Sequence, residues 1–315
     1  MRRALVLALF LSAAGCVGSQ DNPTNVHDLR VLGASFEPPE IFAVSCYDDS
    51  ALAVFASPVV MTALVADPAG AGRSIDYDLR VCASQGDTTC TGDGALTLTR
   101  GSTGPGELVV KDVPASFNPN LRLPLMPGAQ LVDGGTPLLE EVVEHDLYQG
   151  LGGIRLPAVL HVKAGDEEVF AKKLLVFTCK LLPEMTPNHT PRLPGLLLEG
   201  EPWPDDALPD LQGSGPFAVE PEDFQDRLEP YVVPSYSLKP VHLSELWIIS
   251  WRADMGTFSE GDTGGTGFDG IAVAKHHTEW TPGPDATERD VTFWAVVRDG
   301  RGGESWLVRK AHWRP

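Results

Sequence analysis

The 315-residue sequence is poor in three features that would identify many protein classes at once. Beyond residue 16 it has no apolar run of the roughly 18 residues that a membrane-spanning helix requires. It has no long stretch with the apolar spacing of an amphipathic helix. Basic residues are scarce, since 24 Lys and Arg stand against 43 Asp and Glu, and the net charge is −19. An acidic surface repels phosphate backbones, so we do not expect nucleic-acid binding.

Residues that break regular structure are abundant instead. The chain contains 27 prolines and 32 glycines, a frequency that favours short strands joined by turns. In the first half, alternating or short apolar runs predict strands at 29–37, 59–66, 75–82, 95–99 and 107–110.

Two hairpins are predicted more clearly than any other element. Residues 154–163 alternate apolar and polar side chains, turn at 164–166 and continue as a second strand to 179. Near the end of the chain, 291–298 alternates in the same way, Asp299 to Gly303 form a turn, and 304–313 returns. A further strand is expected at 246–252.

A change in composition along the chain divides it into two domains, the first body and the second body. Prolines are dense between residues 183 and 216, and six of the seven tryptophans lie between Trp247 and Trp313. The sequence therefore predicts an all-β protein with a β-sandwich at 27–183, a Pro-rich acidic linker at 184–216, and a Trp-rich β-sandwich at 217–315. The linker is expected to be extended and stiff, and to hold the second sandwich away from the membrane.

The first residues have the pattern of an export signal. Arg2 and Arg3 precede an apolar stretch at 4–14, which is too short to span a bilayer but fits the core of a signal peptide at 1–15. Residues 12–16, Ser-Ala-Ala-Gly-Cys, resemble a bacterial lipobox, with Ala13 in the place usually taken by Leu. The resemblance implies that Cys16 becomes the lipidated N-terminus, followed by a flexible tether at 16–26. Since Val17 rather than Asp follows Cys16, it also implies the outer membrane. The alternative to lipidation is ordinary secretion, with Cys16 an incidental residue near the cleavage site.

Four further cysteines remain, Cys46, Cys82, Cys90 and Cys179, and these allow three disulfide pairings. Cys82 and Cys90 flank a short polar segment that a disulfide closes easily. Cys46 and Cys179 would then tie the beginning of the first body to its end. A zinc site is the alternative, but no Cys-x-x-Cys spacing is present. We therefore predict two structural disulfides in an oxidising compartment.

The second body resembles the immunoglobulin-like and PKD-like modules of bacterial surfaces. The resemblance rests on WRADMGTF at 251–258, Trp280-Thr281-Pro282, and VTFWAVVRDGRGG at 291–303. The first body resembles them through ALVADPAG at 63–70 and YDLRVC at 77–82, with Leu79 where these modules often have Trp. The whole layout resembles uncharacterised lipoproteins of gliding soil bacteria. The resemblance implies the fold and brings no known activity with it.

Candidate ligand sites are few. His276, His277 and Glu279 could contact a metal, but adjacent side chains in a strand point to opposite faces and a polar loop is the better interpretation. Asp262 and Asp269 lie in a glycine-rich stretch without the Asp-x-Asp-x-Asp-Gly spacing of a calcium loop. We predict no metal and no cofactor. Sugar rings could stack on tryptophans if these were exposed, and the candidates are Trp280, Trp306 and Trp313.

The sequence thus favours a non-enzymatic lipoprotein of the cell envelope with a structural or protein-interaction role. Its expected partners are the membrane, through the N-terminal lipid, and an envelope protein or glycan. The alternative is a surface module that binds glycan or calcium. An exported hydrolase is a third hypothesis, and no Gly-x-Ser-x-Gly motif supports it.

Overall fold

The computed structural model describes residues 23–52, 54, 59–92, 95–102, 142, 144–146, 150–266 and 275–315. The signal peptide, Cys16 and the strand predicted at 107–110 lie outside these residues. Almost all of the regular structure is β, and the described residues also include a four-residue helix, α1 (Asp49–Leu52), and a 3-10 turn, η3 (Gln225–Arg227). In this part of the chain, no helix has both the length and the apolarity to span a bilayer.

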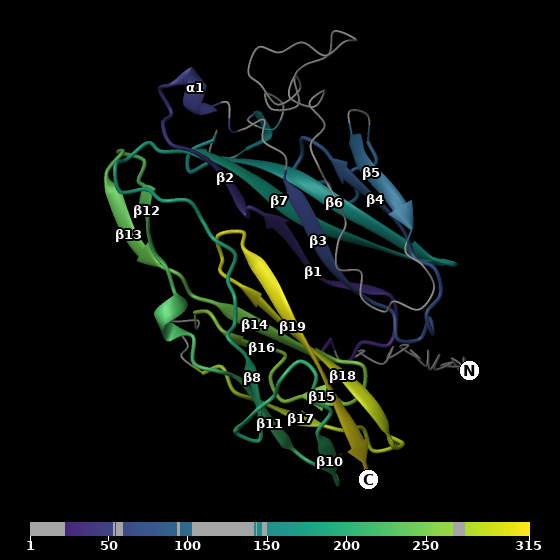
Figure 1. The fold of residues 1–315 in the computed structure, drawn as a ribbon. Helices are drawn as coiled ribbons and strands as arrows, with labels where there is room; N and C mark the ends of the chain where they lie inside the picture. The colour runs from purple at the N-terminus through teal and green to yellow at the C-terminus, as the bar shows by residue number, and fades with distance from the viewer. Residues whose placement is uncertain are drawn as a thin grey trace, which may run out of the picture.

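The first module is a β-sandwich of two sheets (Figure 1). A five-stranded sheet has the order β2-β7-β6-β4-β5, and the pair β1-β3 lies across one face of it. The strands are β1 (Arg30–Glu37), β2 (Glu40–Ala43), β3 (Val60–Ala66), β4 (Asp76–Val81), β5 (Leu96–Ser102), β6 (Ile154–Ala164) and β7 (Glu167–Cys179).

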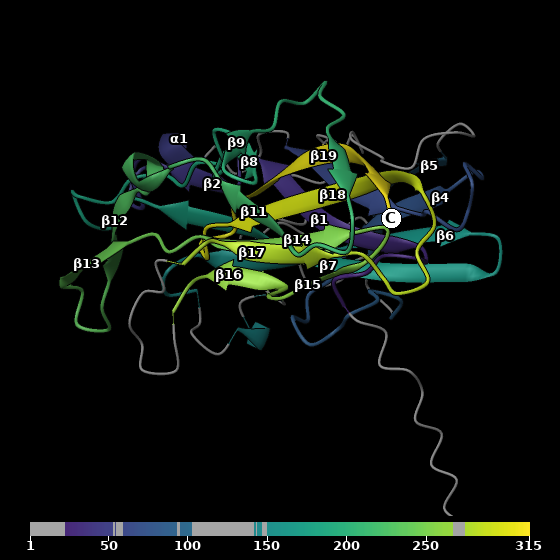
Figure 2. The same ribbon diagram turned by 90° about the horizontal axis from the view of Figure 1, so that it is seen from below.

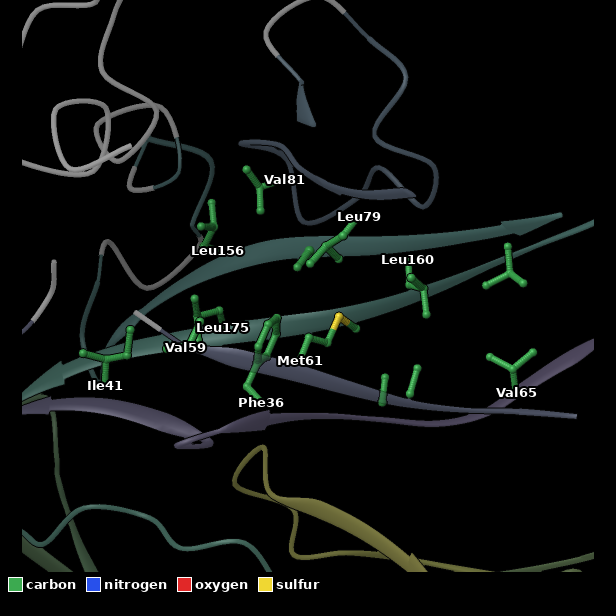
Figure 3. Close-up of a cluster of buried hydrophobic side chains, with 14 of the residues drawn as sticks. Phe36, Ile41, Val59, Met61, Val65, Leu79, Val81, Leu156, Leu160 and Leu175 are labelled. Carbon is green, nitrogen blue, oxygen red and sulfur yellow. The ribbon is translucent and has the colours of Figure 1, made fainter. Parts of the chain in front are cut away.

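The first core lies between these two sheets and is mostly aliphatic (Figure 3). Because side chains alternate along a strand, Met61 and Val65 of β3 point inward to meet Leu79 and Leu160 of the facing sheet. Phe36 is the largest side chain fully buried in this core.

The second module is also a two-sheet sandwich. One sheet has the order β10-β19-β18-β14-β16 and the other the order β15-β17-β11-β8-β9. A separate hairpin, β12-β13, is inserted between β11 and β14. The strands are β8 (Leu196–Leu198), β9 (Glu201–Pro202), β10 (Asp210–Gln212), β11 (Phe217–Pro221), β12 (Pro230–Pro234), β13 (Pro240–Ser244), β14 (Ile248–Ala253), β15 (Thr257–Phe258), β16 (Asp262–Gly264), β17 (Thr278–Thr281), β18 (Arg289–Arg298) and β19 (Glu304–Arg314).

The second core is built around aromatic rings. The ring of Phe293 meets those of Trp203 and Trp280 edge-on, each with 5.1 Å between centroids, and that of Phe258 at 6.2 Å. Edge-to-face contacts of this kind are favourable beyond the area they bury.

One sheet of each module, β2-β7-β6-β4-β5 in the first and β10-β19-β18-β14-β16 in the second, has the same strand order. A short strand pairs in parallel with the last strand, β2 with β7 and β10 with β19. The last two strands form a long hairpin, and its first strand then pairs with β4 or β14. This is the arrangement of an immunoglobulin-like sandwich, in which the final hairpin joins strands F and G and strand C lies beside F. The prediction of two such modules is confirmed.

The Pro-rich stretch differs from the predicted linker. Residues 184–216 contain β8, β9 and β10, and their side chains Leu196, Trp203 and Leu211 are buried in the second core. The strands are only two or three residues long and lie towards the edges of the sheets, where proline is tolerated. This stretch therefore belongs in large part to the second module.

The two modules pack directly against each other rather than standing apart. Because side chains alternate along a strand, Leu64 and Ala66 of β3 point away from the first core. In the same way, Trp294 and Val296 of β18 point away from the second core. These side chains and Val26 form a third buried cluster, the junction. A separate stiff linker at 184–216 is therefore not observed, because both strands are apolar on two faces and the outer faces bury each other.

The residues before β1 bind the second module. The Val26 N–H donates to Ala253 O at 2.7 Å, and the Ala253 N–H donates to Thr24 O at 2.9 Å. The Phe258 N–H also donates to the Thr24 hydroxyl, at 3.2 Å. The end of the predicted tether is therefore held by main-chain hydrogen bonds at the end of β14.

Candidate interaction surface

Two disulfides staple the first module, and the predicted pairing is confirmed. Cys46 bonds Cys179 across a sequence separation of 133 residues, and Cys82 bonds Cys90. The first lies directly beyond the parallel pair β2-β7, where Ala43 is opposite Cys179. Asp87 lies close to Cys82 and Cys90, but both sulfurs are used by the disulfide and Asp87 accepts the Cys90 N–H at 2.9 Å. This group is therefore structural.

A buried carboxylate links the modules at the junction. Glu304, at the start of β19, lies 2.8 Å from Lys173 Nζ of the first module and 2.9 Å from Arg298 Nη2. Arg298 also donates to Leu32 O of β1 at 3.1 Å. A Cβ added to Gly33 would lie 3.0 Å from both Glu304 and Trp306, so β1 and β19 approach as closely as a glycine permits.

The turn between β18 and β19 extends this contact. Asp299 accepts three main-chain N–H groups of the turn and the Asn188 side-chain amide at 2.8 Å. Burial raises the pKa of the Asp299 carboxyl, against the lowering effect of these bonds. Arg301 stacks over the Tyr231 ring at 4.4 Å and lies within salt-bridge distance of Glu40 and Glu245. The turn thus ties the first module to the base of the β12-β13 hairpin.

The tryptophans proposed for sugar stacking do not form a platform. Trp280 and Trp313 are buried in the second core, where their indole N–H groups donate to Met255 O and Gly213 O. Trp306 is partly buried against the junction. These positions leave no open ring face shared by the three residues, so the glycan alternative loses the residues on which it was based.

The proposed metal ligands also lie apart. His276 packs edge-on against Phe224 at 4.8 Å, and burial lowers its pKa. His277 lies 3.7 Å from Glu220, and Glu279 is exposed on β17. Asp262 pairs with Arg252 at 3.5 Å, whereas Asp269 lies outside the described residues.

A polar hollow of about 440 Å³ lies on the outer face of the first module. At its centre Asp78 binds Arg80 through both carboxylate oxygens and His161 Nδ1 at 3.0 Å. Burial opposes ionisation, but these hydrogen bonds hold the pKa of Asp78 below its usual value. His161 is further fixed by Glu168 at 3.2 Å and by stacking on Phe170. The titratable groups here hold neighbouring strands together.

Exposed apolar side chains gather at one end of the molecule. Six of the ten large apolar side chains exposed among the described residues lie on the β12-β13 hairpin or on the loop after β2; they are Tyr236, Leu238, Val241, Leu243, Val44 and Tyr47. Tyr47 is 81% exposed and Tyr236 is 79% exposed. Figure 1 and Figure 2 both place the hairpin at the end of the molecule opposite the tip of β6-β7.

A small hollow of about 160 Å³ lies between this hairpin and the first module. Its lining is mostly apolar and comes from both modules, with Pro234 of β12 on one side and Phe177 and the Cys46–Cys179 disulfide on the other. His242 of β13 also lies 3.6 Å from Glu184. The end of the molecule is thus one surface with contributions from both modules.

The composition of residues 230–244 indicates this surface, although the strand prediction did not consider it. Residues 230–244 include no acidic residue, although 43 occur in the chain. The stretch is also bounded by Glu229 and Glu245, whose main chains are hydrogen bonded to each other at 3.0 Å. A short apolar segment of neutral or basic character inside an acidic chain indicates a surface with a separate use.

No protein-family description and no curated protein matches the sequence. Among solved structures, the alpha-2-macroglobulin of Escherichia coli aligns over 93% of this chain and 22% of its own, at 8% identity and a TM-score of 0.22. This chain thus spans less than a quarter of that protein. The tandem V-type regions of the chitin-binding protein VCBP3 align over 91% and 100% at 10% identity, with a TM-score of 0.24. The fold assignment rests on the strand order described above and not on these similarities.

Proposed function

We propose that this protein is a non-enzymatic lipoprotein of the cell envelope, anchored through Cys16, with an interaction role. The observation that carries the proposal is that two sandwiches are joined into one body by a buried junction and share an exposed apolar end. A large hydrophobic contact fixes two domains relative to each other, and a fixed pair presents a surface in one orientation. Contiguous apolar patches on the surface of a protein often mark interaction sites.

The anchoring part of the proposal is supported by residues of two kinds. The signal pattern at 1–15 and the lipobox-like residues before Cys16 favour export and lipidation, with the outer membrane as the destination. The disulfides of the first module agree with an oxidising compartment outside the cytoplasm.

The non-enzymatic part is supported by the roles of the buried charged groups. Asp67 is held by Arg73 at 2.6 Å, Asp254 binds the Thr292 N–H at 3.0 Å, and Glu304 joins the modules. Each of these carboxylates is used to hold segments of the fold together. The expected partner is therefore another molecule of the envelope that binds the surface.

Metabolic labelling with a fatty-acid analogue tests the anchor. We expect label on the wild-type protein and none on Cys16→Ser, with the protein in the membrane fraction only when labelled. The double variant Cys82→Ser/Cys90→Ser is the control, because it loses cysteines but keeps Cys16. Finding the unprocessed chain in the cytosol with all thiols reduced would refute the proposal.

A further inference from the structure

The β12-β13 hairpin is built as a projecting element with a fixed base. Its first and last main-chain links, Glu245 N–H to Glu229 O and Ser235 N–H to Lys239 O, close both ends of the ladder. At the base, Arg301 packs on Tyr231 and lies 3.6 Å from Glu229. The hairpin is therefore held against the body while every residue of β13 is exposed.

The edges of the hairpin are poor templates for strand addition. In an antiparallel ladder, residues alternate between inward and outward N–H groups. Since 229, 235, 239 and 245 bond inward, the outward positions are 230, 232 and 234 on β12 and 240, 242 and 244 on β13. Prolines occupy 230, 234 and 240 and have no N–H to offer. Val232 on β12 and His242 and Ser244 on β13 keep an outward N–H, so the prolines weaken strand addition at both edges without removing every donor. The side chains of the hairpin are therefore the better target for a partner.

Leu238, at the tip of the hairpin, has a strained backbone conformation. Its φ is 57°, in the left-handed region that glycine and asparagine occupy most readily, and its side chain is exposed. The three residues 236–238 form the kind of hairpin loop that usually ends on glycine at this position. A bulky apolar residue that is both strained and exposed points to use of its side chain, because neither packing nor backbone geometry favours it.

Charge distinguishes the hairpin from the rest of the molecule. The segment 230–244 carries Lys239 and His242 and no carboxylate, while the chain as a whole has a net charge of −19. Two copies of so acidic a body repel each other, which disfavours a second copy as the partner. The acidic surroundings of the hairpin, including Glu184 beside His242 and Glu229 at its base, instead attract a surface with basic groups around an apolar centre.

The position of the hairpin also disfavours the anchoring membrane as its target. The hairpin enters β14 at Ile248, whereas Thr24 and Val26 bind Ala253 at the other end of the same strand. The Leu29 N–H donates to Glu167 at 3.3 Å, which places the start of β1 at the tip of β6-β7, opposite the hairpin. A chain tethered through residues 16–26 thus presents the hairpin away from its anchor.

We propose that the β12-β13 hairpin is the docking element of this protein and inserts Tyr236, Leu238 and Leu243 into an apolar, basic-rimmed groove of another envelope protein. This inference rests on the proposed interaction role and specifies the partner. The side chains fill the groove, the prolines disfavour strand addition, and the acidic body steers the basic rim towards the hairpin.

Site-specific photo-crosslinking in intact cells tests the inference. A photoreactive amino acid replaces Tyr236 in one variant and Leu208 in the control, which is an exposed leucine of the same module on the loop before β10. We expect an adduct with one protein from position 236 and none from 208. Peptides from the adduct should contain apolar residues flanked by Lys or Arg. Raising NaCl from about 50 mM to about 500 mM should slow adduct formation by screening the charges.

We expect Leu238→Asn to fold normally, because the side chain is exposed and asparagine tolerates a positive φ. It should raise the melting temperature slightly and lower the adduct yield about tenfold, as expected for losing about 1.4 kcal/mol of binding. Leu208→Asn should leave the yield unchanged. An adduct with a second copy, equal yields at 236 and 208, or an unaffected yield in Leu238→Asn would each overturn the inference.

A lipid target is tested separately with vesicles of phosphatidylethanolamine and phosphatidylglycerol. The mature Cys16→Ser protein should not float with these vesicles, and flotation abolished by Leu238→Asn would overturn the inference. Fatty-acid labelling of the crosslinking samples separates the two proposals. Labelled protein without an adduct refutes the docking element alone, and an adduct without label refutes only the lipid anchor.

Discussion

The two modules share a strand order but are stabilised by different chemistry. In the first, the parallel pair β2-β7 continues into the Cys46–Cys179 disulfide. In the second, the equivalent pair β10-β19 is completed by hydrogen bonds, since the Trp313 indole N–H donates to Gly213 O at 2.9 Å and the Gly213 N–H donates to Arg314 O. The first core is mostly aliphatic and the second is rich in tryptophan. One topology therefore accommodates two ways of fixing the short parallel strand to the last strand.

The distribution of tryptophan makes this comparison measurable. All seven tryptophans lie between Trp203 and Trp313, and the structure places them in the second core or the junction. Tryptophan fluorescence therefore reports unfolding of the second module, while far-UV circular dichroism reports both.

The largest effect is expected from removing the long disulfide. The double variant Cys46→Ala/Cys179→Ala should lower the free energy of unfolding of the first module by about 4 kcal/mol, because the bond closes a very long loop. Denaturant titration followed by circular dichroism measures the loss. The Cys82–Cys90 disulfide closes a much shorter loop, so Cys82→Ala/Cys90→Ala should lower the free energy of unfolding by about half as much. An equal shift in fluorescence would show that the modules unfold as one unit, and no shift by either probe would contradict the comparison.

The next effect concerns the junction that joins the modules. Glu304→Gln removes the buried charge between Lys173 and Arg298 and should cost about 3 kcal/mol, because two cations lose their shared partner. The fluorescence and circular dichroism transitions should also move apart, as the modules become less coupled. Glu279→Gln on the exposed face of β17 is the control and should change stability by less than about 0.5 kcal/mol. Coincident transitions in Glu304→Gln would mean that the apolar junction alone couples the modules.

A smaller effect tests the hydrogen bond that replaces the disulfide in the second module. Trp313→Phe keeps an aromatic ring but leaves Gly213 O without its indole donor, and should cost about 1 kcal/mol by fluorescence-monitored unfolding. Trp294→Phe is the matched control, since the Trp294 indole nitrogen has no hydrogen-bond partner among the described residues. If both substitutions cost the same, lost ring area rather than the hydrogen bond explains the result.

The smallest effect is a pH dependence in the second module. Hydrogen bonds to Asp290 at 2.7 Å and to Glu288 at 3.2 Å raise the pKa of His312 above its usual value. The stabilisation is therefore complete below the unfolded-state pKa and is lost as pH rises through the folded-state pKa. NMR titration should show His312 titrating at higher pH than His276, whose pKa burial lowers. His312→Gln should flatten the pH dependence of unfolding near neutral pH. A lower titration midpoint for His312 than for His276 would contradict this assignment.

The elements that sequence predicted well were those with long alternation. The hairpins observed at Ile154–Cys179 and Glu304–Arg314 with its partner β18 match the predicted ranges closely, because a period of two over ten residues has no other common cause. The disulfides followed from the number of cysteines and the length of the loops. Strands of two or three residues, such as β9 and β10, are too short to show any period, and the prolines around them concealed their place in the second core.

The candidate surface was harder to predict for a different reason. Alternation identifies which face of a strand is apolar, and in β3 and β18 both faces are. Only the packing of one module on the other shows which apolar face is the junction. The same applies to Trp280 and Trp313, whose burial depends on strands far away in the sequence. The hairpin at 230–244 lacks a core of its own, so its exposure could be seen only once both modules were in place.

The clamp of Thr24 and Val26 on Ala253 determines how the molecule would carry mechanical load. With the lipid anchor that we propose on Cys16, the chain between Cys16 and Pro23 would span at most about 25 Å when fully extended. Force applied along this segment acts on the hydrogen bonds to Ala253 before it acts on β1. The second module therefore bears the load before the first module does. A pulling force on the N-terminus would therefore load the second module first, and the two modules would not unfold in the order of the sequence.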